Sequence, residues 1–300
     1  MQGKGEVTLR VFPRRTTATP TDALAWIGGP GMFPPDGIDK VMVSCAFSWD
    51  LPDCERLVRD WSRIAPTGLG GPATGMRGEE FAPGQFLRPG YVITSRGCPN
   101  RCWFCSVWKR EGLAVRELPI TEGHNVLDDN LLACSETHVR AVFAMLKRQT
   151  EFVQFTGGLE AKRLESWSAE LLCDLKPSHV FFAYDTPDDL EPLQDAVSML
   201  HRLDGGRKRR WIRAYVLCGF PRDTIPAALE RMLVCCRMGV LPMAMLYQDP
   251  NGKKPYGWTR FVRSWASPQI AGKQMTDARA GMECSTECAN AACCGEKEVL

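Results

Sequence analysis

The sequence predicts an α/β protein built around a parallel sheet with helices on its outside. From residue 91 to residue 246, short apolar runs alternate with stretches of helical periodicity, and this alternation is typical of strand–helix units in a parallel sheet. The composition is that of a folded globular protein, because 44% of the residues are hydrophobic and 24% are charged. Six units are fewer than the eight of a closed barrel, so the count fits an open six-unit barrel or a doubly wound sheet.

Length and charge narrow the function classes. The chain has 300 residues, a length typical of about two domains. Its 37 Lys and Arg nearly balance its 35 Asp and Glu, so charge gives no reason to expect a nucleic-acid or membrane-surface partner. No apolar run approaches the roughly 18–20 residues that span a bilayer, and residues 1–10 lack the apolar segment of a signal peptide. We therefore expect a cytoplasmic protein.

Residues 1–88 are predicted to form a small first α/β section. Lys40–Phe47 is an apolar run typical of a buried strand, and Leu51–Ile64 places apolar residues at helical spacing. The Gly- and Pro-rich stretch Gly68–Ala73 follows as a short strand that ends in glycines. A strand, a helix and a second strand together predict one βαβ-like unit.

Residues 89–268 are predicted to form the main section, with the active face at the C-terminal ends of its strands. Residues 269–300 are predicted to be an irregular, Cys-rich tail, because periodicity is lost after Trp265. The expected strands are Tyr91–Thr94, Asn125–Leu127, Phe152–Phe155, Val180–Tyr184, Trp211–Leu217 and Leu241–Leu246, and the expected helices are Glu136–Arg148, Lys162–Leu175, Asp188–Leu203 and Thr224–Met238.

Three cysteines follow the first strand of the main section. Cys98, Cys102 and Cys105 have the spacing C-x3-C-x2-C in a loop. Thiolates are soft ligands that suit zinc or an iron–sulfur cluster. Zinc normally takes a fourth protein ligand, and the nearest candidates downstream are His124 and Cys134. Three thiolates suit a four-iron cluster with one open iron, and a zinc-binding structural or interaction protein is the alternative.

The motif resembles that of the radical S-adenosylmethionine (radical SAM) superfamily, with Phe104 at the aromatic position before the last cysteine. The resemblance covers residues 91–265 and implies a partial (β/α)6 barrel. It also implies a [4Fe–4S] cluster, with S-adenosyl-L-methionine (SAM) on the open iron and an electron donor such as flavodoxin or ferredoxin. The implied activity is reductive cleavage of SAM to a 5′-deoxyadenosyl radical. The substrate, the catalytic residues and the reaction are left open, among them methyl transfer, methylthio transfer and other radical modifications.

The resemblance also implies SAM-binding residues at the next two strand ends. Asp128, Asp129 and Asn130 follow the second strand, where the family places a polar or acidic group for the SAM ammonium. A turn or a helix cap would use the same residues. Gly157 and Gly158 follow the third strand, where paired glycines allow close approach of a ligand or simply a tight turn. Together with Glu160, they could instead be the family's Gly-Gly-Glu element.

Two further strand ends complete this set. Tyr184 and Asp185 follow the fourth strand, where the family often binds the ribose hydroxyls, although Asp185 also suits a helix N-cap. Gly219 and Pro221 follow the fifth strand and resemble the family's turn beside adenine.

The first section resembles a reduced cobalamin-binding domain. The resemblance rests on Ser44–Asp50, the helix after it and Gly70–Pro72. The Asp-x-His-x-x-Gly element of such domains is absent, and all four His residues lie in the main section. We therefore expect a vestigial docking or substrate domain without bound cobalamin.

The tail holds four cysteines at positions 284, 288, 293 and 294. Four thiols in eleven residues suit a second cluster or zinc, or remain free. Adjacent cysteines point apart in extended backbone, so free thiols are the favoured interpretation.

Overall fold

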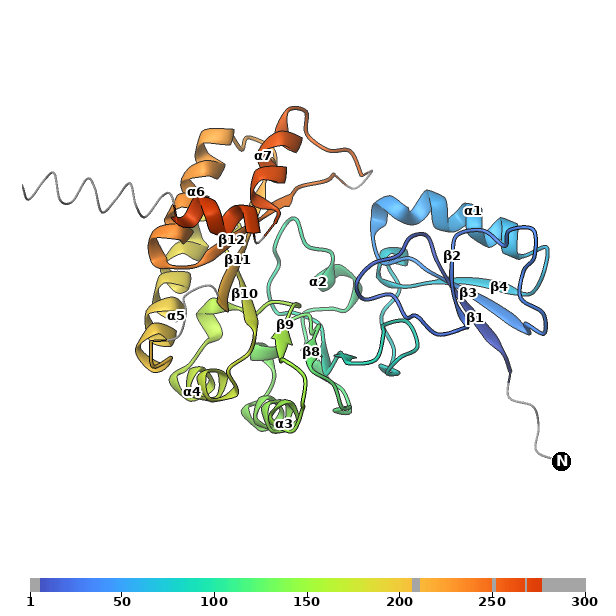
Figure 1. Ribbon diagram of the computed structural model, residues 1–300, viewed down its shortest axis with the longest axis horizontal. Helices are drawn as coiled ribbons and strands as arrows, with labels where there is room; N and C mark the ends of the chain where they lie inside the picture. The colour runs from blue at the N-terminus through green and yellow to red at the C-terminus, as the bar shows by residue number, and fades with distance from the viewer. Residues whose placement is uncertain (1–5, 207–210, 250–251, 268, 277–300) are drawn as a thin grey trace, which may run out of the picture. The chain divides into compact units, whose positions relative to one another are not determined.

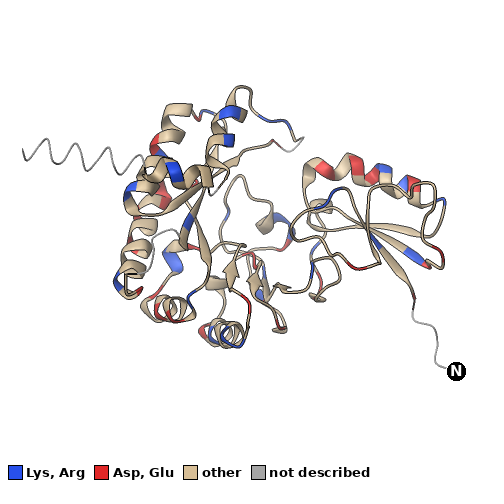
Figure 2. Cartoon of the chain, in the orientation of Figure 1, with Lys and Arg blue, Asp and Glu red and all other residues tan. Residues whose placement is uncertain are grey.

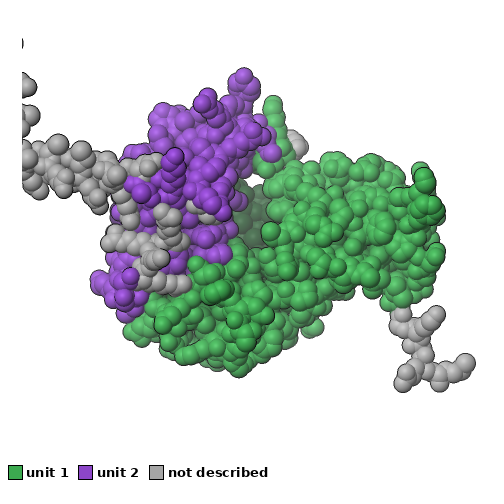
Figure 3. Space-filling model, in the orientation of Figure 1, with its two compact units in different colours: residues 1–178, 248–253 green, residues 179–247, 254–300 purple. Residues whose placement is uncertain are grey.

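The computed structural model describes residues 6–206, 211–249, 252–267 and 269–276 (Figure 1). The chain divides into two compact units, residues 1–178 with 248–253 and residues 179–247 with 254–300 (Figure 3). This division lies inside the predicted main section. The predicted section limits, at residues 88 and 268, stay predictions.

The first unit begins with a four-stranded sheet in which every strand pair is parallel. Its strands are β1 (Thr8–Phe12), β2 (Ala25–Ile27), β3 (Lys40–Ser44) and β4 (Thr67–Gly70), in the order β2-β1-β3-β4. The helix α1 (Leu51–Trp61) connects β3 to β4. The predicted strand–helix–strand unit of this section is therefore confirmed. The strands β1 and β2 were not predicted, because one carries a central arginine and the other has only three residues.

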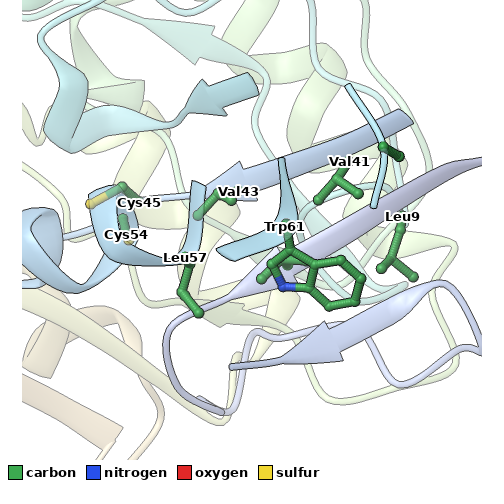
Figure 4. Packing of buried hydrophobic residues seen from close by; sticks show 9 residues of the cluster. Leu9, Val41, Val43, Cys45, Cys54, Leu57 and Trp61 are labelled. Atoms are coloured by element: carbon green, nitrogen blue, oxygen red, sulfur yellow. The ribbon is translucent and has the colours of Figure 1, made fainter. Parts of the chain in front are cut away.

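The core of this sheet lies under α1 (Figure 4). Cys54, Leu57 and Trp61 recur at spacings of three and four along the helix, so they share one side of it. All three are buried. The indole Nε1 of Trp61 donates a hydrogen bond of 3.1 Å to the carbonyl of Gly28, so its one polar atom is satisfied. Charged residues occupy the other side of α1 (Figure 2).

The first unit also holds three parallel strands that begin the main section, β5 (Tyr91–Val92), β8 (Asn125–Val126) and β9 (Gln154–Phe155). Their helices are α3 (Glu136–Lys147) and α4 (Ser166–Leu175), which contact each other. Between β5 and β8 the chain forms an antiparallel pair, β6 (Ser95–Arg96) with β7 (Arg116–Glu117), and α2 (Val107–Arg110) lies between them in sequence. This pair was not predicted, because each partner has only two residues.

The second unit has three parallel strands, β10 (His179–Ala183), β11 (Ile212–Cys218) and β12 (Leu241–Leu246). Its helices are α5 (Leu190–Leu203), α6 (Ile225–Met238) and α7 (Trp258–Trp265). Residues 269–276 are also helical, with Ala271 and Met275 buried, so the start of the predicted irregular tail is ordered. The described residues also include the short 3-10 helices Ser48–Asp50, Pro72–Thr74, Leu131–Ala133, Ala161–Arg163 and Pro187–Asp189.

The predicted class, an α/β protein with parallel sheets, is confirmed. The strand–helix alternation of residues 91–246 appears in both units, with helices close to their predicted limits. No helix in the described ranges combines the length and the apolar character needed to cross a membrane. The four tail cysteines lie outside the described residues.

Candidate functional site

The cysteine loop leaves the antiparallel pair through Gly97. This glycine has φ 95°, and a Cβ atom there would lie 2.5 Å from the carbonyl oxygen of Ala114. Only glycine fits this position without displacement of the backbone. Farther along the loop, the amide of Cys105 donates to the carbonyl of Cys102 at 3.1 Å, and the indole of Trp108 donates to the same carbonyl at 3.0 Å. Local turns and one aromatic side chain therefore shape the loop.

The three predicted ligands, Cys98, Cys102 and Cys105, all lie half-buried on this loop, and none of them forms a disulfide with another described cysteine. Burial raises the pKa of Cys105, and the nearby Cys98 thiol raises it further. Across the described part of the chain, no three His, Cys, Asp or Glu side chains converge in a metal-binding arrangement. The three thiols therefore lie on one loop, and their role as ligands of a common metal centre stays a prediction.

Asp128 holds the start of this loop. Its Oδ1 accepts the backbone N–H of Thr94 at 2.6 Å, and its Oδ2 accepts the hydroxyls of Thr94 and Ser95 at 2.6 and 2.7 Å. Burial raises the pKa of Asp128, against the effect of these hydrogen bonds. His138 Nε2 lies 3.3 Å from the Thr94 hydroxyl and extends the buried polar group toward α3. This carboxylate, predicted to bind the SAM ammonium, is thus engaged by the chain itself.

Asp129 binds the cysteine loop at Gly97. Its Oδ2 accepts the N–H of Gly97 at 2.9 Å, and its Oδ1 lies 3.7 Å from Nη2 of Arg110. Burial raises the pKa of Asp129, while Gly97 and Arg110 oppose this shift. Two adjacent carboxylates at the end of β8 therefore bind the chain that follows β5, Asp128 at Thr94 and Ser95 and Asp129 at Gly97.

Asn130 and Glu160 lie beside the first cysteine. The amide Nδ2 of Asn130 donates to Cys98 Sγ at 3.4 Å and to Glu160 Oε2 at 2.6 Å. Arg163 Nε also donates to Glu160 Oε2 at 2.6 Å. Burial raises the pKa of Glu160, but the hydrogen bonds from Asn130, Asn100 and Arg163 outweigh it and hold the pKa below its usual value. The Asn130 Oδ1 is buried and has no hydrogen-bond partner among the described residues.

The structure therefore joins three of the strand ends that the sequence singled out. A Cβ atom on Gly157 would lie 2.7 Å from the carbonyl oxygen of Asp128, so the end of β9 lies directly against the end of β8. Gly158 follows with φ 87°, as a turn residue. Phe104 contacts Trp103 edge-to-face, with ring centroids 5.3 Å apart. The SAM-binding roles of these residues stay predictions.

A buried ion-pair cluster beside the loop was not predicted. Glu111 accepts Arg110 Nε and Arg116 Nη2, both at 2.9 Å, and the N–H of Gly78 at 3.0 Å. Burial raises the pKa of Glu111, but these donors and the nearby Arg96 lower it below its usual value. Gly78 precedes the loop by 20 residues in sequence, so no local pattern could have identified the contact.

The second unit holds the remaining predicted residues. Asp185 Oδ1 accepts the N–H of Leu217 at 3.0 Å, and burial, with a contribution from Asp189, raises the pKa of Asp185 to about 7. The N-cap of the following turn is Thr186, which shares a capping box with Asp189. The N-cap alternative for Asp185 is therefore wrong. Tyr184 is buried, at 5% exposure.

The end of β11 is a tight turn. Gly219 has φ 76°, and a Cβ atom there would lie 2.8 Å from Pro255 Cγ. Its N–H donates to Asp223 Oδ2 at 2.8 Å, and Asp223 pairs with Arg231 at 2.9 Å. The turn also contains Pro221. Its resemblance to the family's turn beside adenine stays a prediction.

Comparison with known proteins gave matches among solved structures but none in sequence. No family model matches the sequence, and no curated protein matches it. Among solved structures, the chain is similar to TsrM, a radical S-adenosylmethionine methyltransferase from Kitasatospora setae with cobalamin and a [4Fe–4S] cluster bound. The identity is 10% and the TM-score 0.57, over 82% of this chain and 77% of that one. This similarity shows a shared α/β fold.

The match corrects one expectation. It covers 82% of the chain, a larger share than residues 89–300, so it includes part of the first section. The expectation of a domain without cobalamin is contradicted, because the matching structure holds cobalamin as well as its cluster. The missing His element was the wrong criterion, because TsrM shares only 10% identity with this chain and fold similarity can persist without shared motifs.

Replacing Asp128 with Asn should destabilise the protein. An amide in place of the carboxylate presents an NH2 donor to groups that themselves donate. The expected loss is about 1–3 kcal/mol in the free energy of unfolding, measured by denaturant titration. The control is Asp53→Asn on α1. The Asp53 side chain is 65% exposed, so its replacement should change the free energy of unfolding by less than about 1 kcal/mol. Equal stability of Asp128→Asn and wild type would contradict this role for Asp128.

Asp185 should make stability depend on pH. Its pKa is about 7 in the folded protein and near 3.8 when exposed, so the folded form holds a proton that the unfolded form releases. Its stabilising effect is complete below pH 3.8 and is lost as the pH rises toward 7, by at most about 1.4 kcal/mol per pH unit. Asp185→Asn lacks this dependence and should gain stability relative to wild type as the pH rises. Parallel stability curves for the two proteins would contradict the shift.

Proposed function

We propose that this protein is a radical SAM enzyme that holds a [4Fe–4S] cluster through Cys98, Cys102 and Cys105. The observation that carries the proposal is the three-cysteine loop at the end of the first strand of a parallel α/β section. Three thiolates match the donor set of such a cluster. The similarity of fold to a radical SAM methyltransferase supports the same class. When bound, the cluster supplies one electron that cleaves SAM and yields a 5′-deoxyadenosyl radical.

In this proposal, Asn130 and Glu160 work beside the cluster site. The Asn130 amide donates to Cys98 Sγ, and a hydrogen bond to a thiolate stabilises its negative charge and raises the reduction potential. Glu160 carries a full negative charge at neutral pH, because its pKa is lowered. Its Oε1 is buried and has no hydrogen-bond partner among the described residues, so it can accept from the ammonium group of SAM, whereas both oxygens of Asp128 already accept hydrogen bonds.

The finer parts of the proposal concern the barrel and the reaction. We take the parallel strands of both units as a partial (β/α)6 barrel whose strand ends hold SAM. The four residues of the second unit, Tyr184, Asp185, Gly219 and Pro221, would then bind the nucleoside part of SAM. Methyl transfer is the reaction class that the comparison favours over methylthio transfer and other radical modifications. Flavodoxin or ferredoxin would supply the electron, in the cytoplasm.

The central test is loss of the cluster in Cys102→Ala. Two thiolates leave a second iron exposed, so the variant should lose its iron and all SAM cleavage. Iron content after anaerobic reconstitution and the yield of 5′-deoxyadenosine are the measurements. Cys173→Ala, which removes a cysteine in α4, should keep both. Full iron content in Cys102→Ala, or zinc alone in the wild-type protein, would contradict the proposal, and zinc alone would favour the structural zinc-binding alternative.

A second cofactor, cobalamin, fits the carboxyl edge of the first sheet. In the order β2-β1-β3-β4, strand order reverses beside β1, and ligands of parallel sheets bind outside the strand ends at such a point. Phe47 and Trp49 follow β3 there and stack with centroids 4.7 Å apart, both about two-fifths exposed. Their apolar faces fit a flat macrocycle. Every His lies at residue 124 or later, so no imidazole of the first section would bind the cobalt.

Hydroxocobalamin binding to the full chain tests this second cofactor. Trp49→Ala removes half of the aromatic pair, and loss of about 1 kcal/mol of contact should weaken binding roughly fivefold. The matched control is Ile64→Ala, which alters a side chain of similar exposure, 41%, beyond the other end of α1. Absorbance of the cobalamin retained after gel filtration is the measurement. No retention by the wild-type protein, or equal weakening by both variants, would contradict the site.

A further inference from the structure

The sheet of the second unit has two unlike faces. Phe182, Ala214 and Pro242 lie side by side in the strand register, and all are buried. α6 contacts β11 and β12. Along each strand, the neighbours of these buried residues point to the opposite face of the sheet, because side chains alternate along a strand. That face carries Arg213 and Tyr215 on β11.

Arg213 is a charged group without an anionic partner. Within the described residues it forms no ion pair, and its Nε is buried with no hydrogen-bond partner. Burial lowers the pKa of Arg213, yet an arginine stays protonated at neutral pH. A partly desolvated cation without a partner is costly for a folded protein. Such a group is typical of a site that receives an anion.

Aromatic rings surround this cation. Phe181 and Tyr215 stack almost parallel, with centroids 4.1 Å apart and planes 4° apart. The guanidinium carbon of Arg213 lies 5.6 Å from the centre of the Phe181 ring, so the ring supports the charge without neutralising it. His179 contacts Phe181 edge-to-face at 5.4 Å. Burial, with a contribution from Arg213, lowers the pKa of His179 to about 4, so the imidazole adds no charge at neutral pH.

We propose that Arg213 binds an oxyanion group, a carboxylate or a phosphate, of the enzyme's substrate, while the partly exposed ring of Tyr215, backed by Phe181, packs against its apolar part. That this ligand is the substrate of a radical SAM enzyme rests on the function proposed above; the anion site itself rests on Arg213 and its surroundings. A guanidinium recognises either oxyanion through paired hydrogen bonds. Met243, opposite Tyr215 in the register, and Met245, which is 47% exposed, extend the face with adaptable apolar side chains.

Ligand-observed NMR on the full chain tests the site with three small probes. Benzoate and phenyl phosphate carry the two oxyanions on an aromatic ring, and benzamide is the uncharged analogue of benzoate. We expect saturation transfer to at least one anionic probe and much less to benzamide. Arg213→Gln should weaken binding of that probe about tenfold, the effect of losing one charge-assisted hydrogen bond. Arg202→Gln, an exposed arginine on α5, should bind as wild type does.

Several outcomes would overturn the assignment. They are equal binding of benzoate and benzamide, binding of neither anion, or unchanged binding in Arg213→Gln. Displacement of the probe by SAM, with weaker SAM binding in Arg213→Gln, would assign the arginine to SAM instead. Should Arg213→Gln fail to fold, Arg213→Met keeps the apolar stem beside Phe181 and removes the charge. Probe binding needs neither iron nor SAM cleavage, so its failure and that of the proposed function are separate results.

Discussion

The carboxylate of Asp128 joins the strand ends on which the candidate site is built. It accepts three hydrogen bonds from Thr94 and Ser95, which fixes the exit of β5 to the end of β8. Its own carbonyl lies so close to Gly157 that no larger residue fits there, which brings the end of β9 to the same place. A buried carboxylate must have its acceptor capacity filled. The hydrogen bonds that Asp128 needs as a buried carboxylate therefore also fix the position at which the cysteine loop begins.

Beyond that starting point, charge rather than apolar packing holds the loop. Its cysteines are half-buried and the loop contributes few core residues, so hydrophobic burial contributes little there. Glu111 instead gathers Arg110, Arg116 and the backbone of Gly78. Arg110 also approaches Asp129, so the ionic cluster and the strand-end carboxylates form one connected network. A loop held in this way can keep its thiols accessible to an incoming cluster.

The proposed chemistry uses different features in each part of the chain. The first sheet offers exposed aromatic rings at its carboxyl edge, where Arg14 lies 5.3 Å from the Phe47 ring. The strand ends of β5, β8 and β9 offer soft sulfur donors with an amide and a carboxylate beside them. β11 offers a cation among aromatic rings. In the proposals, these environments would receive a flat macrocycle, a metal cluster with an ammonium group beside it, and an oxyanion, respectively. A fold shared at 10% identity is consistent with such sites resting on particular side chains rather than on overall similarity.

The sequence alone determined the parallel α/β class, most of the helices and the three-cysteine loop. Each of these depends on patterns that span fewer than 20 residues, such as helical periodicity or cysteine spacing. It missed β1, which carries a central arginine, and β2, β6 and β7, which have only two or three residues each. It also predicted that cobalamin is absent from the lack of one sequence motif. Only the tertiary structure decided what Asp128, Glu111 and Arg213 do. The partners of Asp128 and Gly78 lie about 33 residues away along the chain, and Arg213 is distinguished by having no anionic partner among the described residues. Both depend on how distant segments pack, which no local pattern encodes.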